Sequence, residues 1–321
     1  MSLALCCLSH SPLMEFVHPS PEVRARVDEA LAGARDFVTA YDPELVVIFA
    51  PDHYNGFFYD MMPPFCVGGR AEAVGDFRTP AGALSVDHDA ALALTRAALD
   101  AGIDVALSER MIVDHGFSQP LDILFGGIGR RPVVPVFINS VAAPFAPVSR
   151  IREFGEALGR AARDLDRRVL FIGSGGLSHD PPVPRMADAD TEEEVARLID
   201  NRNPSPQARA AREARTIAAA EAFAAGGGGL HPLNPAWDNL VLDTLGAGDL
   251  GKVDGWSTDW FAEQAGNSAH EVRTWIAAYA ALSAAGPYHM ESRYYEAIEA
   301  WIAGFAVTTA LPLPRSLPQD R

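Results

Sequence analysis

Four of the nine histidines lie shortly after apolar runs that have the composition of buried strands. They are His10, His53, His115 and His179, which follow the runs 3–8, 45–50, 103–107 and 169–172. Because ligands bind at the carboxyl ends of strands in an open parallel sheet, we expect these imidazoles to meet at one edge. Imidazole serves there as a metal ligand or as a general acid or base near neutral pH.

A carboxylate that could complete a metal site is Glu271, behind the turn at 266–268. The pair His270-Glu271 does not begin an HExxH zinc motif, because Thr274 stands where the second histidine would be. Two histidines and one carboxylate with open positions are typical of non-haem Fe(II) oxygenases, and some catalytic zinc sites use the same donors. These residues therefore predict a metal centre and leave iron and zinc both open.

The glycine-rich segment 173–179 allows the backbone to approach a ligand closely. It matches neither the GxxxxGK[ST] phosphate loop nor GxGxxG, which disfavours a nucleotide site. The remaining histidines with no such placement are expected to be structural or superficial. They are His18, His88, His231 and His289.

Composition narrows the function classes. The chain has 321 residues, 48% hydrophobic and 21% charged, which is the balance of a globular protein. Its net charge of −16 opposes binding to nucleic acid or to an anionic membrane surface. The single lysine, Lys252, makes Schiff-base chemistry improbable. Three cysteines without a CxxC pair predict no disulfide framework and favour a reducing cytoplasm, and no apolar run reaches the length of a membrane span.

The order of elements predicts an α/β fold. Strand-like runs alternate with helix-period segments, including a helix capped by Ser20 with Pro21 at its first position. Further helices are expected at 88–101, 120–125 and 151–165, with a strand at 133–138. This alternation indicates a largely parallel or mixed sheet with helices on both faces.

The chain after residue 186 shows helical patterns and few strand candidates. Helices are expected within 197–225, with a break at 203–206, and at 240–245 and 269–285. We interpret them as an extra C-terminal helical layer on the same sheet. One catalytic domain is thus expected over residues 1–310, followed by a loose, proline-containing tail at 311–321.

Six segments together resemble the class III extradiol ring-cleavage dioxygenases, the protocatechuate 4,5-dioxygenase beta-subunit superfamily. They are residues 7–12, 49–60, 114–117, 173–179, 230–235 and, more loosely, 296–305. The resemblance runs from about residue 9 to residue 305, and the segment 188–229 departs most from the family pattern.

This resemblance implies a catalytic site and its reactants. His10, His53 and Glu271 would hold Fe(II). His179 would accept a proton from the substrate, and His115 would donate one. Asp114 would either tune His115 or be a solvated surface acid. The reactants would be O2 and a catechol with a carboxylate side chain, and the protein would be a homo-oligomer.

Several alternatives share part of this pattern. An arginine is the natural partner of the substrate carboxylate, but 25 arginines leave its identity open. A related extradiol enzyme for another catechol or an aminophenol would share every metal and acid-base residue. A zinc hydrolase would use the same two histidines and Glu271, and an interaction protein would need no acid-base pair.

Overall fold

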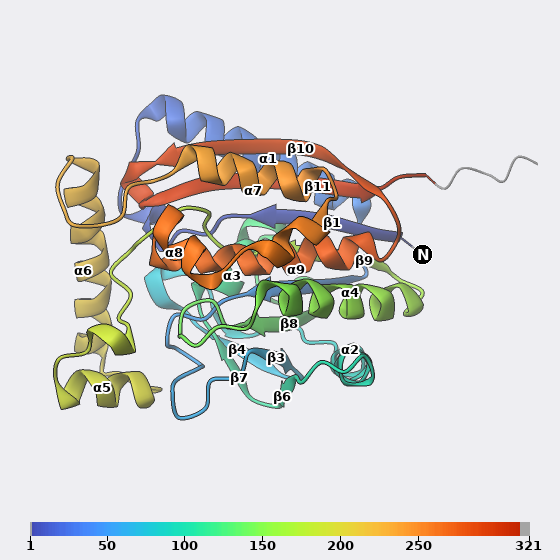
Figure 1. The fold of residues 1–321 in the computed structure, drawn as a ribbon, viewed down its shortest axis with the longest axis horizontal. Helices are drawn as coiled ribbons and strands as arrows, with labels where there is room; N and C mark the ends of the chain where they lie inside the picture. The colour runs from blue at the N-terminus through green and yellow to red at the C-terminus, as the bar shows by residue number, and fades with distance from the viewer. Residues whose placement is uncertain (1, 315–321) are drawn as a thin grey trace, which may run out of the picture.

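The computed structural model describes residues 2–314 of the chain (Figure 1). The strands of the main sheet are β1 (Ser2–Leu8), β2 (Leu45–Ala50), β3 (Phe65–Gly68), β6 (Ala106–Ser108), β8 (Val133–Ile138), β9 (Arg168–Gly173), β10 (Tyr288–Ile298) and β11 (Ala303–Pro312). A small second sheet contains β4 (Ala71–Val74), β5 (Ala81–Ala83) and β7 (Met111–Val113).

The helices are α1 (Pro21–Tyr41), α2 (His88–Asp100), α3 (His115–Phe125), α4 (Val148–Asp164), α5 (Glu192–Ile199), α6 (Pro206–Ala224), α7 (Pro235–Gly246), α8 (Thr258–Ala265) and α9 (Val272–Ser283). Short 3₁₀ helices are η1 (Pro12–Glu15), η2 (Asp76–Arg78), η3 (Met186–Asp188), η4 (Leu250–Gly255), η5 (Asn267–Glu271) and η6 (Glu299–Trp301).

The main sheet is mixed, with the strand order β10-β11-β1-β9-β2-β8-β3-β6. Its centre, β1, β9, β2 and β8, is parallel, whereas β11 runs antiparallel to β1 and β3 runs antiparallel to β8. Every residue of β2 and β8 is buried, which is why both strands are continuous apolar runs in the sequence. The expected α/β class with a mixed central sheet is confirmed.

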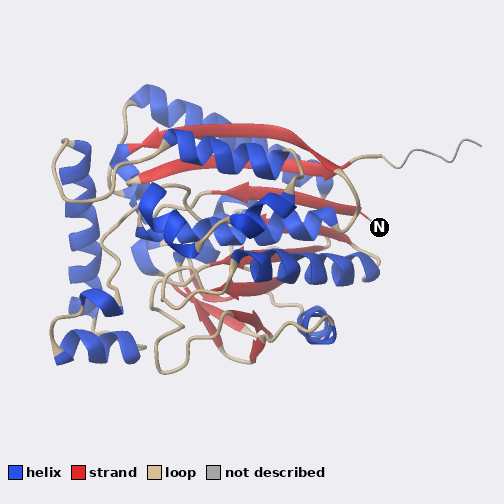
Figure 2. Cartoon of the chain, in the orientation of Figure 1, coloured by secondary structure: helices blue, strands red, loops and turns tan. Residues whose placement is uncertain are grey.

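Helices cover both faces of this sheet (Figure 2). Alternate residues of β1 point to opposite faces: Leu5 belongs to the core shared with α2, α4 and α7 to α9, and Cys6 to the core shared with α1 and α3. The C-terminal helices therefore pack on the same sheet, as expected. Helices α5 and α6 lie instead beside the sheet, at the left of Figure 1.

Two sequence predictions need correction. The region after residue 186 contains two long strands, β10 and β11, which form one edge of the sheet. The burial pattern of β10 does not alternate, because only its two end residues are fully buried, so this strand lacks the signal of a half-buried strand. Leu311 and Pro312, expected in a loose tail, pair with His289 and Tyr288 in the β10–β11 ladder. Residues 315–321 lie outside the described part of the chain.

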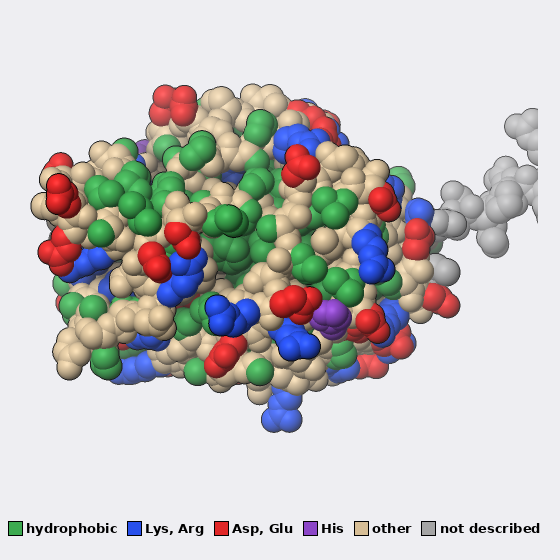
Figure 3. Space-filling view, turned by 90° about the horizontal axis from the view of Figure 1, so that it is seen from below, with side chains coloured by type: hydrophobic (Ala, Val, Ile, Leu, Met, Phe, Trp, Pro, Cys, Tyr) green, Lys and Arg blue, Asp and Glu red, His purple; other side chains and the backbone are tan. Residues whose placement is uncertain are grey.

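The face shown in Figure 3 carries charges of both signs. Acidic and basic side chains are interspersed there with apolar ones and form no patch of a single sign. Within residues 2–314, no helix is long and apolar enough to cross a membrane.

Candidate active site

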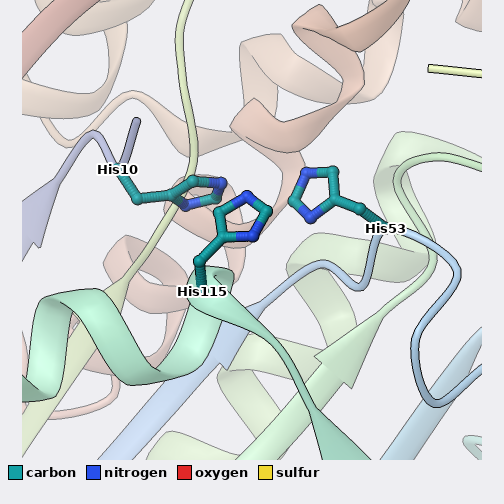
Figure 4. A group of neighbouring side chains, drawn as sticks. All are labelled: His10, His53 and His115. Carbon is teal, nitrogen blue, oxygen red and sulfur yellow. The ribbon is translucent and has the colours of Figure 1, made fainter. Parts of the chain in front are cut away.

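The four histidines predicted from the sequence line one pocket beyond the carboxyl ends of β1, β2 and β9. Figure 4 shows three of them, His10, His53 and His115, with their rings close together. Donor atoms of these three lie within 4.8 Å of one another. The pocket is also lined by His179 and Glu271, so the structure brings together all five predicted side chains.

His10 is oriented through its Nδ1 atom by Ser174. Pro120 lies inside α3 and has no N–H, so the carbonyl of Gly116 receives no helix bond from it. The Ser174 hydroxyl donates to this carbonyl at 2.6 Å and lies 2.9 Å from Nδ1 of His10. Because the hydroxyl donates its own hydrogen to Gly116, Ser174 must accept a hydrogen bond from Nδ1–H, which leaves the Nε2 lone pair of His10 facing the pocket.

Asp114 orients His53 in the same way. Its Oδ2 atom accepts from the backbone nitrogen of His53 at 2.7 Å and lies 3.0 Å from Nδ1 of the ring. Oδ1 accepts from Gly116 N at 2.9 Å and so caps α3. Asp114 is fully buried, which rules out the solvated surface acid. Its hydrogen-bonded imidazole is His53, whereas the sequence prediction placed it beside His115.

His115 is held by an acid that the sequence analysis missed. Oδ2 of Asp76 lies 2.7 Å from Nδ1 of His115, and Oδ1 accepts from its backbone nitrogen at 2.9 Å. Asp76 is fully buried and begins the short helix η2, in which Phe77 has a φ of 47°. No spacing in the sequence predicts this pair, because the two residues are 39 positions apart and meet through an irregular turn.

His179 has a neutral partner. Its Nδ1 atom lies 3.1 Å from the carbonyl of Leu177, so Nδ1 is the donor and Nε2 faces the pocket. The preceding residue is fixed by the buried Asp238, which accepts from the backbone nitrogen and the hydroxyl of Ser178, both at 2.7 Å. Gly304 lies against this carboxylate, where an added Cβ would be 2.1 Å from Asp238 Oδ2.

The Glu271 carboxylate meets three of these Nε2 atoms. Oε2 lies 3.4 Å from His10, and Oε1 lies 3.0 Å from His53 and 3.1 Å from His179. Donors bonded to one metal ion at about 2.1 Å and at right angles are roughly 3 Å apart, so the spacing fits a shared ion. Glu271 comes from η5, just before α9, and is fully buried.

Burial and charge act against each other on these groups. Burial lowers the pKa of His10 to about 3, which keeps its ring neutral and able to act as a ligand. Burial would also lower the pKa of His53, but the charges of Asp114 and Glu271 outweigh it and hold this pKa well above its usual value. Burial would raise the pKa of Glu271, yet the surrounding imidazoles, His179 foremost, hold it well below its ordinary range.

Two polar residues next to the proposed ligands in the sequence, Asp52 and His270, make structural contacts. The Asp52 carboxylate accepts from the backbone nitrogens of Asn55 and Phe57 and shapes the turn that carries His53. His270, next to Glu271, lies instead against the rings of Phe145 and Phe261. Four other histidines do not line the pocket, as expected: His18, His88, His231 and His289.

Fold and site together define a ring-opening oxygenase. Residues 4–306 match the family model described as the catalytic LigB subunit of aromatic ring-opening dioxygenase. The chain belongs to this family, and it is an extradiol ring-cleaving dioxygenase, as the resemblance implied.

Curated relatives are similar over almost their whole length. One from Rhodococcus sp is 61% identical, across 97% of this chain and 99% of its own length. Relatives from Rhodococcus jostii and Paraburkholderia phymatum are each 57% identical, across 97% of this chain and 99% and 98% of their own lengths. All three are named 2,3-dihydroxyphenylpropionate/2,3-dihydroxicinnamic acid 1,2-dioxygenase.

Proposed function

We propose that this protein uses Fe(II) and O2 to cleave the ring of 3-(2,3-dihydroxyphenyl)propionate and of 2,3-dihydroxycinnamate. The names of its relatives support these substrates. Cleavage between the substituted ring carbon and the adjacent hydroxylated carbon would convert the propionate into 2-hydroxy-6-oxonona-2,4-dienedioate. The observation that carries the proposal is the approach of the Glu271 carboxylate to Nε2 of His10, at 3.4 Å, and to Nε2 of His53, at 3.0 Å, in one pocket.

In this proposal His10, His53 and Glu271 hold the metal. Two imidazoles, each binding through an Nε2 atom that carries no proton once the metal is bound, and one carboxylate form the donor set that suits ferrous oxygenases. Fe(II), when bound there, would bind the catechol oxygens and pass electrons from the ring to O2. Ser174 and Asp114 accept hydrogen bonds from Nδ1–H of His10 and His53, so both Nε2 atoms face Glu271.

The acid-base roles follow from the different partners of the other two imidazoles. His179 donates Nδ1–H to a carbonyl, so its Nε2, which lies 3.1 Å from Oε1 of Glu271, is the atom that would accept the phenolic proton when Glu271 holds the metal and the catechol binds. The Nδ1 atom of His115 is held by the Asp76 carboxylate, so Nε2 is the atom placed to deliver a proton later in the reaction. Asp114 is a positioning residue for His53.

The first experiment measures oxygen uptake. Protein is loaded with Fe(II) under argon, then mixed with air-saturated 3-(2,3-dihydroxyphenyl)propionate while an oxygen electrode and visible absorbance are recorded. One O2 consumed for each yellow product formed is expected, with at least a 100-fold loss of rate in His179→Gln and in His115→Gln. Uptake with another catechol alone would reassign the substrate. The proposal would be overturned if no catechol caused oxygen uptake. Hydrolase activity of the zinc-loaded protein would also overturn it.

Metal analysis of variants tests whether the third ligand beside His10 and His53 is Glu271, as proposed, or His115. Glu271→Gln is expected to lose bound iron, whereas His115→Gln should retain it. The matched control is His270→Gln, because this neighbour of Glu271 faces aromatic rings and does not line the pocket. Iron lost from His115→Gln and kept by Glu271→Gln would replace the proposed set with three histidines.

A further inference from the structure

Helix α6 places one arginine in the pocket. Arg212 is the only lysine or arginine among the described residues that line it. Its side chain is 25% exposed, and Thr216, one turn further along α6, lines the pocket beside it. Among the described residues, Arg212 is therefore the one cation in this pocket that could meet the carboxylate of the candidate substrate.

The guanidinium of Arg212 is positioned mainly by neutral acceptors. Nη2 donates to Oδ1 of Asn55 at 3.0 Å, and Nη1 donates to the backbone carbonyl of His53 at 3.5 Å. The nearest carboxylate, Oδ2 of Asp76, is 3.8 Å from Nη2, beyond hydrogen-bond distance, and already bonds His115. Arg212 is thus paired with Asp76 only at this longer distance and hydrogen-bonded to neutral acceptors, so its guanidinium can still form a bidentate contact with a second carboxylate.

The surroundings of Arg212 fit an aromatic acid. The same pocket is lined by Phe77, Val183 and Trp301, which offer apolar surface to a ring and its methylene groups. Arg212 touches the backbone of His53, whose ring faces Glu271. A catechol whose hydroxyls lie beside the His53 ring would therefore have its ring substituent in the same pocket as the guanidinium.

We propose that Arg212 forms the subsite for the side-chain carboxylate of the substrate and so selects 2,3-dihydroxyphenyl acids over uncharged catechols. This inference rests on the proposed function, since it concerns the substrate of the same pocket. A charge-assisted bidentate contact of a planar guanidinium with a carboxylate supplies both the affinity and the orientation.

The test compares two substrates that differ in charge: 3-(2,3-dihydroxyphenyl)propionate and 3-propylcatechol. Arg212→Gln is expected to lower the ratio of their kcat/KM values about 10- to 100-fold, mainly through KM for the acid. Arg212→Lys should recover part of the ratio, because it restores the charge without the planar fork. The control is Arg215→Gln, an exposed arginine of α6 outside the pocket, which should leave the ratio unchanged.

Equal losses with both substrates in Arg212→Gln would overturn the inference and leave Arg212 as a brace for Asn55. Binding of 3-phenylpropionate, measured calorimetrically without O2, separates this outcome from failure of the proposed function. This acid has the carboxylate but no hydroxyls to cleave. Its affinity should fall in Arg212→Gln even if no catechol were turned over, and an unchanged affinity would contradict the carboxylate subsite.

Discussion

The carboxylate of Asp76 is bonded to His115 at both the ring and the backbone, at 2.7 and 2.9 Å. The acid belongs to the turn beside the small sheet, whereas His115 is the first residue of α3. This double contact fixes the ring relative to its own backbone, and it leaves Nε2 as the atom that can act in the pocket.

Asp76→Asn is expected to lower kcat about 100-fold, because the amide can still accept from Nδ1 but no longer places a negative charge beside the ring. The KM and the iron content should change little, and Asp76→Glu should recover part of the rate. Steady-state oxygen uptake and metal analysis of the same samples measure these quantities. A parallel loss of iron and activity would indicate that Asp76 only maintains the fold.

Ser174→Ala removes the hydroxyl that accepts a hydrogen bond from Nδ1–H of His10. Iron affinity should weaken about 10- to 100-fold, as measured by Fe(II) titration against a competing chelator under argon. Ser140→Ala is the matched control, since this buried serine follows β8 and bonds only the Ile138 carbonyl. Similar affinities in both variants would show that the serine does not govern the orientation of His10.

Asp87 gives a prediction about pH. It caps α2 and pairs with Arg167 at 2.5 Å; burial opposes its charge, but Arg167 holds the pKa of this carboxyl below its usual value. A lowered folded pKa contributes stability above the unfolded pKa of about 3.9, and this stability is lost as pH falls through the folded pKa.

Asp87→Asn keeps the cap and removes the charge. At pH 7 the free energy of unfolding should fall by up to about 1 kcal/mol, because the pair is partly exposed. Urea titrations of both proteins should converge once the pH falls below the lowered pKa of Asp87. A difference that stays constant down to that pH would show that the charge of Asp87 is not its cause.

Two glycines of α4 allow its backbone to touch α9. A Cβ added at Gly159 would lie 2.1 Å from the carbonyl oxygen of Ala281, so Gly159→Ala should destabilise the fold by about 1 to 3 kcal/mol. In α1, Gly33 has no atom within 4 Å, and Gly33→Ala should add up to about 1 kcal/mol. Chemical denaturation of the two variants measures both changes, and the same sign for both would contradict the close contact.

The sequence predicts the sheet best where burial is complete. The runs at 45–50 and 133–138 are strands with those bounds, because both of their faces are covered. The start of α1 at Pro21 follows from the Ser20 cap. The helix expected from Pro120 begins five residues earlier, because the side chain of Asp114 caps it there and Ser174 takes the carbonyl that Pro120 leaves unbonded.

In the candidate site, too, local sequence predicts some residues, and others depend on tertiary contacts. The strand ends predict the positions of His10, His53 and His179, and their convergence with His115 and Glu271 is confirmed. Asp76 and Arg212 were not identified, because their contacts with the site depend on how an irregular turn and a peripheral helix fold back. Such placement is a property of tertiary structure, which local patterns do not encode.

Helix α6 enters after the break at 203–206 and ends before the glycines at 226–229, and it carries Arg212 from outside the sheet layers (Figure 1). The proposed metal donors come from other segments, at strand ends and before α9. In the proposed roles, chemistry and substrate choice reside on different segments of the chain. A change of α6 that kept its contacts with His53 and Asn55 could alter the ring substituent accepted without replacing a proposed metal donor.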